Sequence, residues 1–368
     1  MTTLRSAVSW LAPLFLCACG DSTPSVHIDS GVVADGGSDA APPVDSGGGT
    51  VDVATSPDAP PAKPHLQYCT GRSFVPTAAT GTWNSTANQI AAALGSAGHS
   101  AQDAIVTPAA TKAVNAVFTY STFSYAIDGE TVLVFLDDCG VGWHDLGSFT
   151  TDSNGRVSVP VTESLPVGVY EMRFEVAADA TMTYAYLWVL PAGSHIAVAD
   201  IDGTLTTSDT EMALQFFSDL YSGAYVASSY PGAVDLTTAE VGRGHVLLYL
   251  TARPYWLANM TRAWLSTQAY AFGPLHTTDN NTDATTNVAP YKQAYLQGLV
   301  DAGFLLDLGY GNATTDIDAY TGVGIPATQI WIIGSNGGTG GTNAVTDTWA
   351  DVAAAVAASP AVVQPFLW

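Results

Sequence analysis

Two aspartates stand two residues apart at the end of an apolar run, in the stretch HIAVADIDGTLTTSD that begins at His195. A carboxylate such as Asp200 can attack a phosphorus centre, and a second carboxylate at Asp202 can protonate the leaving oxygen and then activate water. Many strands also end at an aspartate before a glycine turn, and Gly203 suits such a turn. The pair by itself therefore leaves a catalytic and a structural interpretation open.

More polar residues follow the later apolar segments of this half of the chain. Thr251 follows VLLYL, Lys292 lies near the start of a predicted helix, and Asn312 and Asp316 follow LLDLGYG. Lysine occurs only three times in the whole chain, which makes a lysine at this place informative. Because the carboxyl ends of parallel strands share the edge of a sheet where ligands bind in open α/β folds, we expect these residues to meet there.

Together these residue types would serve phosphate chemistry. Asp200, the backbone carbonyl of Asp202, and Asn312 or Asp316 offer the all-oxygen ligands that Mg²⁺ prefers. The hydroxyl and backbone N–H of Thr251 would bind a phosphate oxygen, and the lysine would stabilise the charge of the transition state. Simpler interpretations remain for each: the threonine could cap a helix, the lysine could be a solvated helix residue, and the asparagine and second acid could be turn residues before a helix.

The motifs in this order look like the four motifs of the haloacid dehalogenase (HAD) superfamily. The words DIDGTLTTSD, YLTARPYWLANMTRAWL and GYGNATTDIDAYTGVGI resemble the LNS2 domain, and the resemblance covers roughly residues 150–345. LNS2 occurs in lipins, which are Mg²⁺-dependent phosphatidate phosphatases. It also occurs in membrane-associated phosphatidylinositol transfer proteins. Their LNS2 domain lacks the first aspartate and binds phosphatidate. The resemblance thus implies either phosphatidate hydrolysis through an aspartyl-phosphate or phosphatidate binding without turnover, and the presence of both Asp200 and Asp202 favours hydrolysis.

The resemblance also assigns further residues to the site. Arg253 matches an arginine of the LNS2 loop and would contact a phosphate, with an electrostatic role at the sheet edge as the alternative. Gly203 and Thr204 fall in the substrate-binding loop that follows the aspartates. Arg262 and Trp264 match the family as well, and we interpret them as packing residues.

The predicted secondary structure differs between the two halves of the chain. Residues 65–192 hold short aromatic and β-branched segments separated by turns, which predict an antiparallel, immunoglobulin-like β-sandwich. From 193 to 368 apolar strands alternate with helices, which predicts an α/β domain, a parallel sheet with helices on both faces. With the resemblance, this is a HAD-like Rossmannoid LNS2 phosphatase domain. His195 and His245 precede strands at the opposite edge, and we expect structural roles for them.

Residues 1–19 contain an apolar run followed by small residues, which is typical of a secretory signal peptide. The sequence LCAC ending at Cys19 resembles a bacterial lipobox, so we expect lipidation there, with a plain signal peptide as the alternative. Residues 20–64 are rich in Pro, Gly, Ser, Ala and Asp, which predicts a disordered linker. The protein is thus expected to be exported and membrane-anchored, where Cys69 and Cys139 could form a disulfide.

Charge limits the partners. The chain has 10 Lys and Arg against 33 Asp and Glu, a net charge of −23, and no basic cluster. Binding to nucleic acid, which requires neutralisation of phosphates, is therefore excluded, and electrostatic docking on an anionic membrane is disfavoured. We expect a monomer that takes a phosphate ester, with phosphatidate as the candidate, and that reaches the membrane through its lipid anchor.

Overall fold

A computed structural model of the protein describes residues 62–120, 125–208, 226–280, 282–284 and 286–368. The predicted signal peptide, the lipidation site at Cys19 and almost all of the predicted linker lie outside the described residues. The described part of the chain falls in one compact unit, Pro60–Trp368. None of the helices in this described part is long and apolar enough to cross a membrane.

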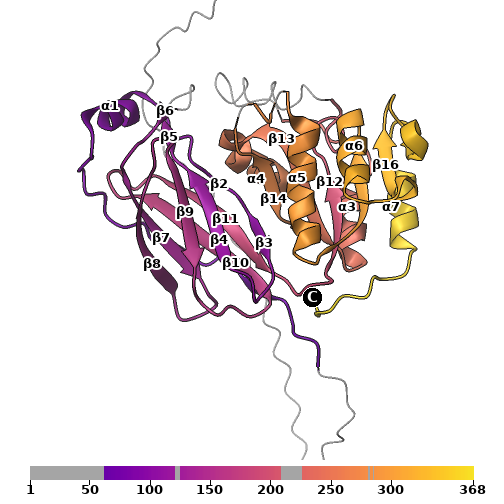
Figure 1. Cartoon of the computed structure of the whole chain (residues 1–368), viewed down its shortest axis with the longest axis horizontal. Helices are drawn as coiled ribbons and strands as arrows, with labels where there is room; N and C mark the ends of the chain where they lie inside the picture. Colours follow the sequence, from indigo (N-terminus) through magenta and orange to yellow (C-terminus); the bar gives the residue numbers. More distant parts are fainter. Residues whose placement is uncertain (1–61, 121–124, 209–225, 281, 285) are drawn as a thin grey trace, which may run out of the picture. The chain divides into compact units, whose positions relative to one another are not determined.

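The first half of this unit is a β-sandwich-like region (Figure 1). One sheet has the strand order β3-β11-β10-β7-β8, with β1 also beside β10, and a second sheet has the order β2-β4-β9. An antiparallel pair of β5 and β6 and the helix α1 complete the region. The elements are β1 (Gln67–Cys69), α1 (Thr86–Leu94), β2 (Ser100–Ala101), β3 (Ala104–Val106), β4 (Lys112–Val117), β5 (Thr119–Tyr120), β6 (Tyr125–Ala126), β7 (Thr131–Asp137), β8 (Trp143–Thr150), β9 (Arg156–Val161), β10 (Gly168–Val176) and β11 (Met182–Val189).

The sandwich is not purely antiparallel, which corrects the prediction. β1 runs parallel to β10, and β3 runs parallel to β11, while the other strand pairs of the two sheets are antiparallel. Both exceptions are short strands that reach their partners through long connections, and a long connection does not impose the antiparallel direction that a hairpin does. Between the sheets, alternate residues of β7 and β4 such as Val132, Val134 and Val114 are completely buried.

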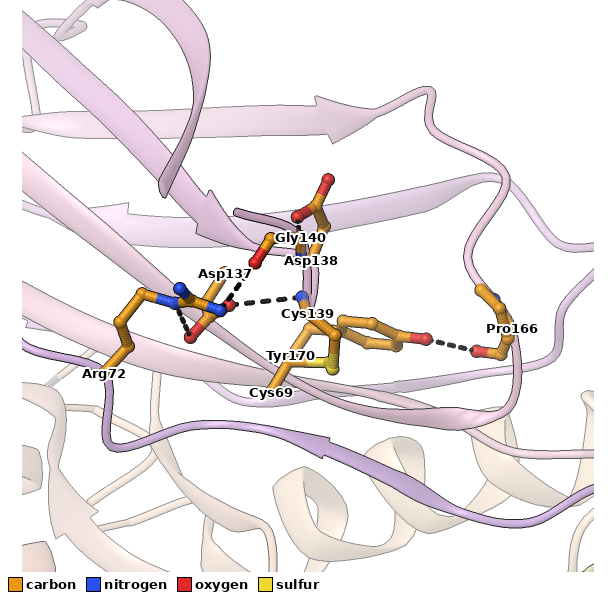
Figure 2. The surroundings of a disulfide bond; sticks show 8 residues. All are labelled: Cys69, Arg72, Asp137, Asp138, Cys139, Gly140, Pro166 and Tyr170. Carbon is orange, nitrogen blue, oxygen red and sulfur yellow. Dashed lines mark hydrogen bonds and ion pairs between the residues drawn. A yellow bond between two sulfur atoms is a disulfide. The ribbon is translucent and has the colours of Figure 1, made fainter. Parts of the chain in front are cut away.

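A disulfide joins Cys69 of β1 to Cys139, which follows β7 (Figure 2). Asp137 lies beside it, where its carboxylate accepts hydrogen bonds from the backbone N–H of Cys139 and from Nε of Arg72. The two cysteines are therefore paired in the structure, as the sequence predicted. The bond fastens the short strand β1 to the end of a central strand of the same sheet.

The second half of the unit is a parallel six-stranded sheet with helices on both faces (Figure 1). The strand order β14-β13-β12-β15-β16-β17 places the first strand in the middle, so the chain first winds outward on one side and then on the other. The elements are β12 (His195–Ala199), α3 (Ala233–Gly242), β13 (Val246–Pro254), η1 (Tyr255–Leu257), α4 (Ala258–Thr267), β14 (Leu275–Thr278), α5 (Val288–Asp301), β15 (Leu305–Gly311), α6 (Thr314–Gly322), η2 (Ala327–Gln329), β16 (Ile330–Ile333), η3 (Thr339–Gly341), β17 (Asn343–Val345) and α7 (Ala350–Ala357).

Both faces of this sheet are buried, because side chains alternate along each strand. Ile196 and Val198 of β12 face a core that includes residues of α5 and α6. Ala197 and Ala199 face a second core, which includes residues of α3, α4 and α7. A strand buried on both faces reads as a continuous apolar run, which is why IAVA was recognisable in the sequence.

The two halves share a core and a polar seam. Trp188 of β11 and Ile196 of β12 belong to the same buried cluster. At the seam, the buried carboxylate of Asp103 pairs with Arg262 of α4 at 2.5 Å and accepts the backbone N–H of Leu275 in β14 at 2.8 Å. The predicted boundary at residue 192 falls in the turn between these two strands.

The end of the predicted linker differs from expectation. Pro64 accepts a hydrogen bond from the backbone N–H of Leu367, and Lys63 donates to the carbonyl of Gln364. Residues 62–64 therefore lie along the C-terminal segment. The next residue, His65, forms an isolated parallel β-bridge with Leu367.

Candidate functional site

A cavity of about 280 Å³ opens at the carboxyl ends of β12, β13 and β15. This is the point where the chain reverses its winding direction, because β12 has β13 on one side and β15 on the other. Such a switch point leaves a crevice between the loops, and ligands bind there in open α/β sheets. The residues that line the cavity are Asp200, Asp202, Thr251, Ala252, Arg253, Ala284, Val288, Lys292, Asn312, Ala313, Thr315 and Asp316.

Asp200 is the first polar residue after β12 and is 5% exposed. Its Oδ1 lies 2.6 Å from Nζ of Lys292, and its Oδ2 accepts a hydrogen bond of 3.0 Å from the hydroxyl of Thr204. Burial raises the pKa of this carboxyl to about 7, against the opposing attraction of the lysine. Asp200 is thus a buried carboxyl whose charged form depends on a nearby cation.

Lys292 of α5 joins two carboxylates, because its Nζ also donates to Oδ1 of Asp316 at 2.7 Å. Burial by itself would lower the pKa of this lysine, but the two carboxylates outweigh it and raise the pKa. The lysine is 2% exposed, so it is not a solvated helix residue. It carries a positive charge in the interior of the site, as the scarcity of lysine in the sequence suggested.

Asp316 has two functions at the start of α6. Its Oδ2 accepts the backbone N–H groups of Asn312 and Ala313, both at 3.1 Å, while Oδ1 binds Lys292. Asp316 therefore lies in the first turn of α6 and not in the turn before it, where it caps the helix and lines the cavity, while its role as a metal ligand stays a prediction.

Asp202 is held by Arg253 in a bidentate pair. Nε and Nη2 of the arginine each donate to one carboxylate oxygen at 2.9 Å. The guanidinium is itself buried, donates from Nη1 to Thr261 at 3.0 Å, and lies over the ring of Trp264 at 5.7 Å. Arg253 therefore lines the cavity as predicted, but its charge is directed at Asp202.

Thr251 is part of β13 and does not cap a helix, which corrects one of the two interpretations offered for it. The strand continues to Pro254, and α4 begins only at Ala258, after a single 3₁₀ turn. The Thr251 hydroxyl accepts the backbone N–H of Arg253 at 3.1 Å and lies 3.4 Å from Oδ2 of Asp202. It therefore lies next to the second aspartate, on the wall of the cavity.

Gly203 and Thr204 form the turn after the aspartates and are not among the residues that line the cavity. Gly203 adopts a φ of 72°, which a residue without a Cβ adopts at little cost, and its N–H donates to the Thr206 hydroxyl. The role of these two residues in binding a substrate stays a prediction. In the structure, Thr204 positions Asp200.

A divalent cation fits the donor set on one side of the cavity. The hydroxyl of Thr204 lies 3.0 Å from Oδ2 of Asp200 and 3.3 Å from Oδ1 of Asn312, so the two side chains that would supply oxygen ligands lie on either side of one hydroxyl. No cluster of three His, Cys, Asp or Glu side chains with metal-binding geometry occurs in the described residues. A cation held by Asp200 and Asn312 would therefore need further ligands. The backbone carbonyl of Asp202 and the carboxylate of Asp316 are the ones that the sequence predicted.

The charges of the site do not balance. Three carboxylates line the cavity, those of Asp200, Asp202 and Asp316, against the two cations Lys292 and Arg253. A phosphate could enter only if further positive charge were present, because it would otherwise meet a net negative wall. The chemistry of the donors and the charge deficit both fit Mg²⁺.

One residue of the site was missed in the sequence. Asn336 follows β16, and its side-chain amide donates to the backbone carbonyl of Asn312 at 2.8 Å, which anchors the loop after β15. The signal was available, because Asn336 is also a polar residue just after an apolar strand, IWII, at the same edge of the sheet.

Other predicted residues lie outside the cavity. Trp264 packs as predicted, 2% exposed, with its indole N–H on the carbonyl of Ala227. Arg262 is buried too, but its ion pair with Asp103 of the seam makes it more than a packing residue. His195 and His245 both contact Oδ2 of one acid, Asp307, at 2.7 and 3.1 Å.

Two domains of known proteins match consecutive parts of this chain. Residues 97–189 match the beta-sandwich domain of PITM 1-3, and residues 197–334 match the LNS2 domain of PITM 1-3. The similarity thus extends further into the sandwich than the sequence motifs indicated.

Three relatives show the extent of the similarity. Membrane-associated phosphatidylinositol transfer protein 3 of Homo sapiens is 31% identical over 65% of this chain and 24% of its own length. Protein retinal degeneration B of Drosophila melanogaster is 31% identical over 66% of this chain and 18% of its own length. Membrane-associated phosphatidylinositol transfer protein 1 of Rattus norvegicus is 28% identical over 74% of this chain and 21% of its own length. The chain therefore corresponds to a quarter or less of these relatives, and it contains an LNS2 domain homologous to theirs, preceded by a region that matches the beta-sandwich domain of PITM 1-3.

Proposed function

We propose that this protein is a Mg²⁺-dependent phosphomonoester hydrolase in which Asp200 is the nucleophile. The observation that carries the proposal is the pair of aspartates at the switch point of the sheet, with Lys292 bound to the first and Arg253 to the second. A pure binding module would not need a second carboxylate beside the first. Both are present here on the wall of one cavity.

The reaction has two steps in this proposal. A carboxylate oxygen of Asp200 attacks phosphorus, the bond from phosphorus to the ester oxygen breaks, and Asp202 gives its proton to the leaving alcohol. Asp202 then takes a proton from water, whose oxygen attacks the aspartyl-phosphate, and inorganic phosphate leaves with Asp200 restored. Because Arg253 engages both oxygens of Asp202, at least one of those hydrogen bonds has to open for the acid step.

The remaining side chains hold the reacting groups. Lys292 keeps Asp200 charged and oriented in an interior where burial favours the neutral acid. Thr251, on the same wall, would donate its hydroxyl to a phosphate oxygen. Mg²⁺, bound by Asp200, the carbonyl of Asp202 and Asn312 or Asp316, would supply the positive charge that the site lacks.

The substrate in this proposal is a phosphatidate-like phosphomonoester. The support is the homology to proteins named for phosphatidylinositol transfer, together with the position of the cavity at the carboxyl edge of the sheet. The predicted lipid anchor at Cys19 and the linker would hold the domain near a membrane, because the chain has a net charge of −23 and gains nothing from an anionic surface.

The decisive experiment compares wild type with Asp200→Asn. Wild type should release phosphate from an aryl phosphate and from phosphatidate in vesicles, and EDTA should stop both reactions. Asp200→Asn should abolish turnover in protein that circular dichroism shows to be folded, since the amide cannot form the acyl-phosphate. Turnover that survives in this variant would show that Asp200 is not the nucleophile.

A second experiment addresses the anchor. In Cys19→Ser, with export maintained by a plain signal peptide, turnover of soluble esters should be unchanged while turnover of vesicular phosphatidate falls sharply. An equal response of both substrates would point to a soluble phosphate ester.

The alternative is a phosphatidate-binding module without turnover. The engagement of Asp202 by Arg253 and the names of the relatives favour it. Flotation of the protein with phosphatidate vesicles, with and without Mg²⁺, combined with a phosphate assay, separates the two. Stoichiometric binding without phosphate release would establish the alternative.

A further inference from the structure

Two glycines of β15 make room for one face of α6 close to Asp200. Gly309 and Gly311 are two residues apart, so they lie on the same face of the strand. A Cβ on Gly309 would lie 2.4 Å from Cδ2 of Tyr320, and a Cβ on Gly311 would lie 2.6 Å from Cβ of Asp316. Both distances are too short for a side chain to fit without a shift of its neighbour. The sequence GYG of this strand therefore allows α6 to pack closely against it.

Asp316 and Tyr320 lie one turn apart on this face of α6, because residues i and i+4 of a helix are neighbours. Both side chains are buried. Asp316 acts on the carboxylate of Asp200 through Lys292, whose Nζ donates to both acids. Tyr320, in contrast, reaches the backbone of the same aspartate. One helix face therefore approaches Asp200 from two directions.

The hydroxyl of Tyr320 meets the backbone of Asp200 at the carbonyl of Tyr310. This carbonyl accepts the Tyr320 hydroxyl at 3.0 Å and the backbone N–H of Asp200, also at 3.0 Å. Burial and the charges of Asp316 and Asp200 raise the pKa of Tyr320 well above its usual value, although a hydrogen bond from the backbone N–H of Asp200 to the phenol oxygen opposes them. The phenol therefore keeps its proton and remains a donor to the carbonyl.

These contacts lie where the backbone leaves the sheet. β12 ends at Ala199, and Asp200 is followed by the turn that contains Gly203 at positive φ. The bond from the N–H of Asp200 to β15 thus fixes the main chain of this residue just before the turn. Attack on phosphorus depends strongly on such placement, because a displacement of about 1 Å can cost about 10²-fold in rate.

We propose that Tyr320 is a positioning residue for the nucleophile and acts through the backbone of Asp200. One face of α6 then holds Asp200 at both ends, the carboxylate through Lys292 and the N–H through the Tyr320 hydroxyl and the carbonyl that it shares. The inference rests on the proposed role of Asp200 as the nucleophile. Loss of the hydroxyl would loosen the main chain at Asp200 without removing any group that lines the cavity.

Tyr320→Phe, which removes only the hydroxyl, tests the proposal. With an aryl phosphate and Mg²⁺, kcat should fall about tenfold while KM changes by less than about twofold, because attack is more sensitive to geometry than binding is. Tyr170→Phe is the matched control, since the Tyr170 hydroxyl also donates to a backbone carbonyl, that of Pro166 at 2.8 Å, but in the sandwich (Figure 2). Both variants lose one such hydrogen bond, and only Tyr320→Phe should lose kcat. An unchanged kcat in folded Tyr320→Phe, or an equal fall in Tyr170→Phe, would overturn the proposal while leaving the hydrolase activity intact.

Beryllofluoride, which binds an aspartate carboxylate as a mimic of a phosphoryl group, gives a measurement that needs no turnover. Isothermal titration calorimetry with beryllofluoride and Mg²⁺ should show binding about tenfold weaker in Tyr320→Phe than in wild type, unchanged in Tyr170→Phe and lost in Asp200→Asn. Gly309→Ala, which keeps the hydroxyl but displaces its ring, is the second variant and should also weaken binding. Wild type that binds beryllofluoride without releasing phosphate would contradict the hydrolase proposal alone. Equal affinities of wild type and folded Tyr320→Phe, or no binding by wild type, would overturn the positioning role.

Discussion

The two ends of the parallel sheet each carry a buried charged network, and the networks differ in how their charges balance. At the carboxyl end, Asp200, Asp202 and Asp316 face two cations around a cavity of about 280 Å³. At the amino end, a cavity of about 690 Å³ includes Asp307 and His245 in its lining. The larger cavity lies at the end without the sequence motifs, so volume alone does not identify the site.

The amino-end network is internally paired. The buried carboxylate of Glu240 accepts the hydroxyl of Tyr310 and lies 2.6 Å from Nδ1 of His245. Arg243 also pairs with Glu240, and His195 with Asp307. Each acid has basic partners from several elements, which ties α3 to the sheet. The comparison teaches that a surplus of carboxylates at a cavity marks a place for a ligand, whereas matched charges mark a structural joint.

The largest effect should come from Lys292→Met, which leaves Asp200 and Asp316 buried without their shared cation. Breaking a buried pair in this way costs about 3–5 kcal/mol, measurable as the free energy of unfolding in urea. Lys112→Met is the matched control, because Lys112 is also buried but its one hydrogen bond among the described residues goes to the carbonyl of Pro108, so about 1 kcal/mol is expected. Similar losses in both variants would contradict a special role for the carboxyl-end network.

The Asp202→Ala variant tests the acid role at the same end. Turnover of alkyl phosphates should fall by about 10²–10⁴, the usual contribution of general acid–base catalysis. Aryl phosphates should lose less, because their leaving groups need less protonation. The measurement is kcat/KM against leaving-group pKa, and an equal loss across the series would argue against proton transfer by Asp202.

The Arg253→Lys variant should have a smaller effect. It keeps the charge beside Asp202 but loses the bidentate geometry, so kcat/KM for an alkyl phosphate should drop about tenfold. Arg243→Lys at the amino end is the control, since Arg243 pairs with Glu240 outside the catalytic cavity, and it should leave kcat/KM unchanged. Equal activity of both variants would show that catalysis does not require the bidentate hydrogen bonds from Arg253 to Asp202.

The smallest effect concerns pH and the amino end. Hydrogen bonds from His245 and His195 lower the pKa of Asp307 although burial opposes this, and hydrogen bonds to Asp307 and Glu240 raise the pKa of His245 above its usual value although burial opposes this. The contribution of Asp307 to stability is complete above about pH 4 and lost as pH falls through its lowered pKa. That of His245 is complete below about pH 6.5 and lost as pH rises through its raised pKa.

The stability difference between wild type and Asp307→Asn should therefore be greatest between about pH 4 and 6.5, at roughly 1–3 kcal/mol. Urea unfolding across this range measures it. Turnover of an aryl phosphate should not change, because the substitution lies at the end opposite the cavity. A difference that is flat with pH, or a loss of turnover, would break the distinction between the two ends.

Local signals in the sequence were sufficient for the parallel sheet and for most residues of the cavity. Ile196–Ala199 reads as a strand buried on both faces, and a polar residue directly after such a strand lies at the carboxyl edge whatever the strand order is. The same rule placed Asn312 directly after β15, and the apolar run before Thr251 placed that residue near the end of β13. It also points to the loop after β16, which contains Asn336. The rule failed for the edge strands of the sandwich, because the direction of β1 and β3 depends on partners distant in the sequence.

The sequence by itself determined which residue types gather at the carboxyl edge, because strand direction and hydrophobic alternation are local properties of the chain. Only the tertiary structure decided how their charges pair. The spacing of Asp200 and Asp202 does not reveal that Lys292 holds the first and Arg253 the second, since those cations arrive from α5 and β13 through packing. The cavity of about 670 Å³ between the two halves follows from packing too, because Ile105 of β3 and Leu299 of α5, which both line it, come from different halves of the unit.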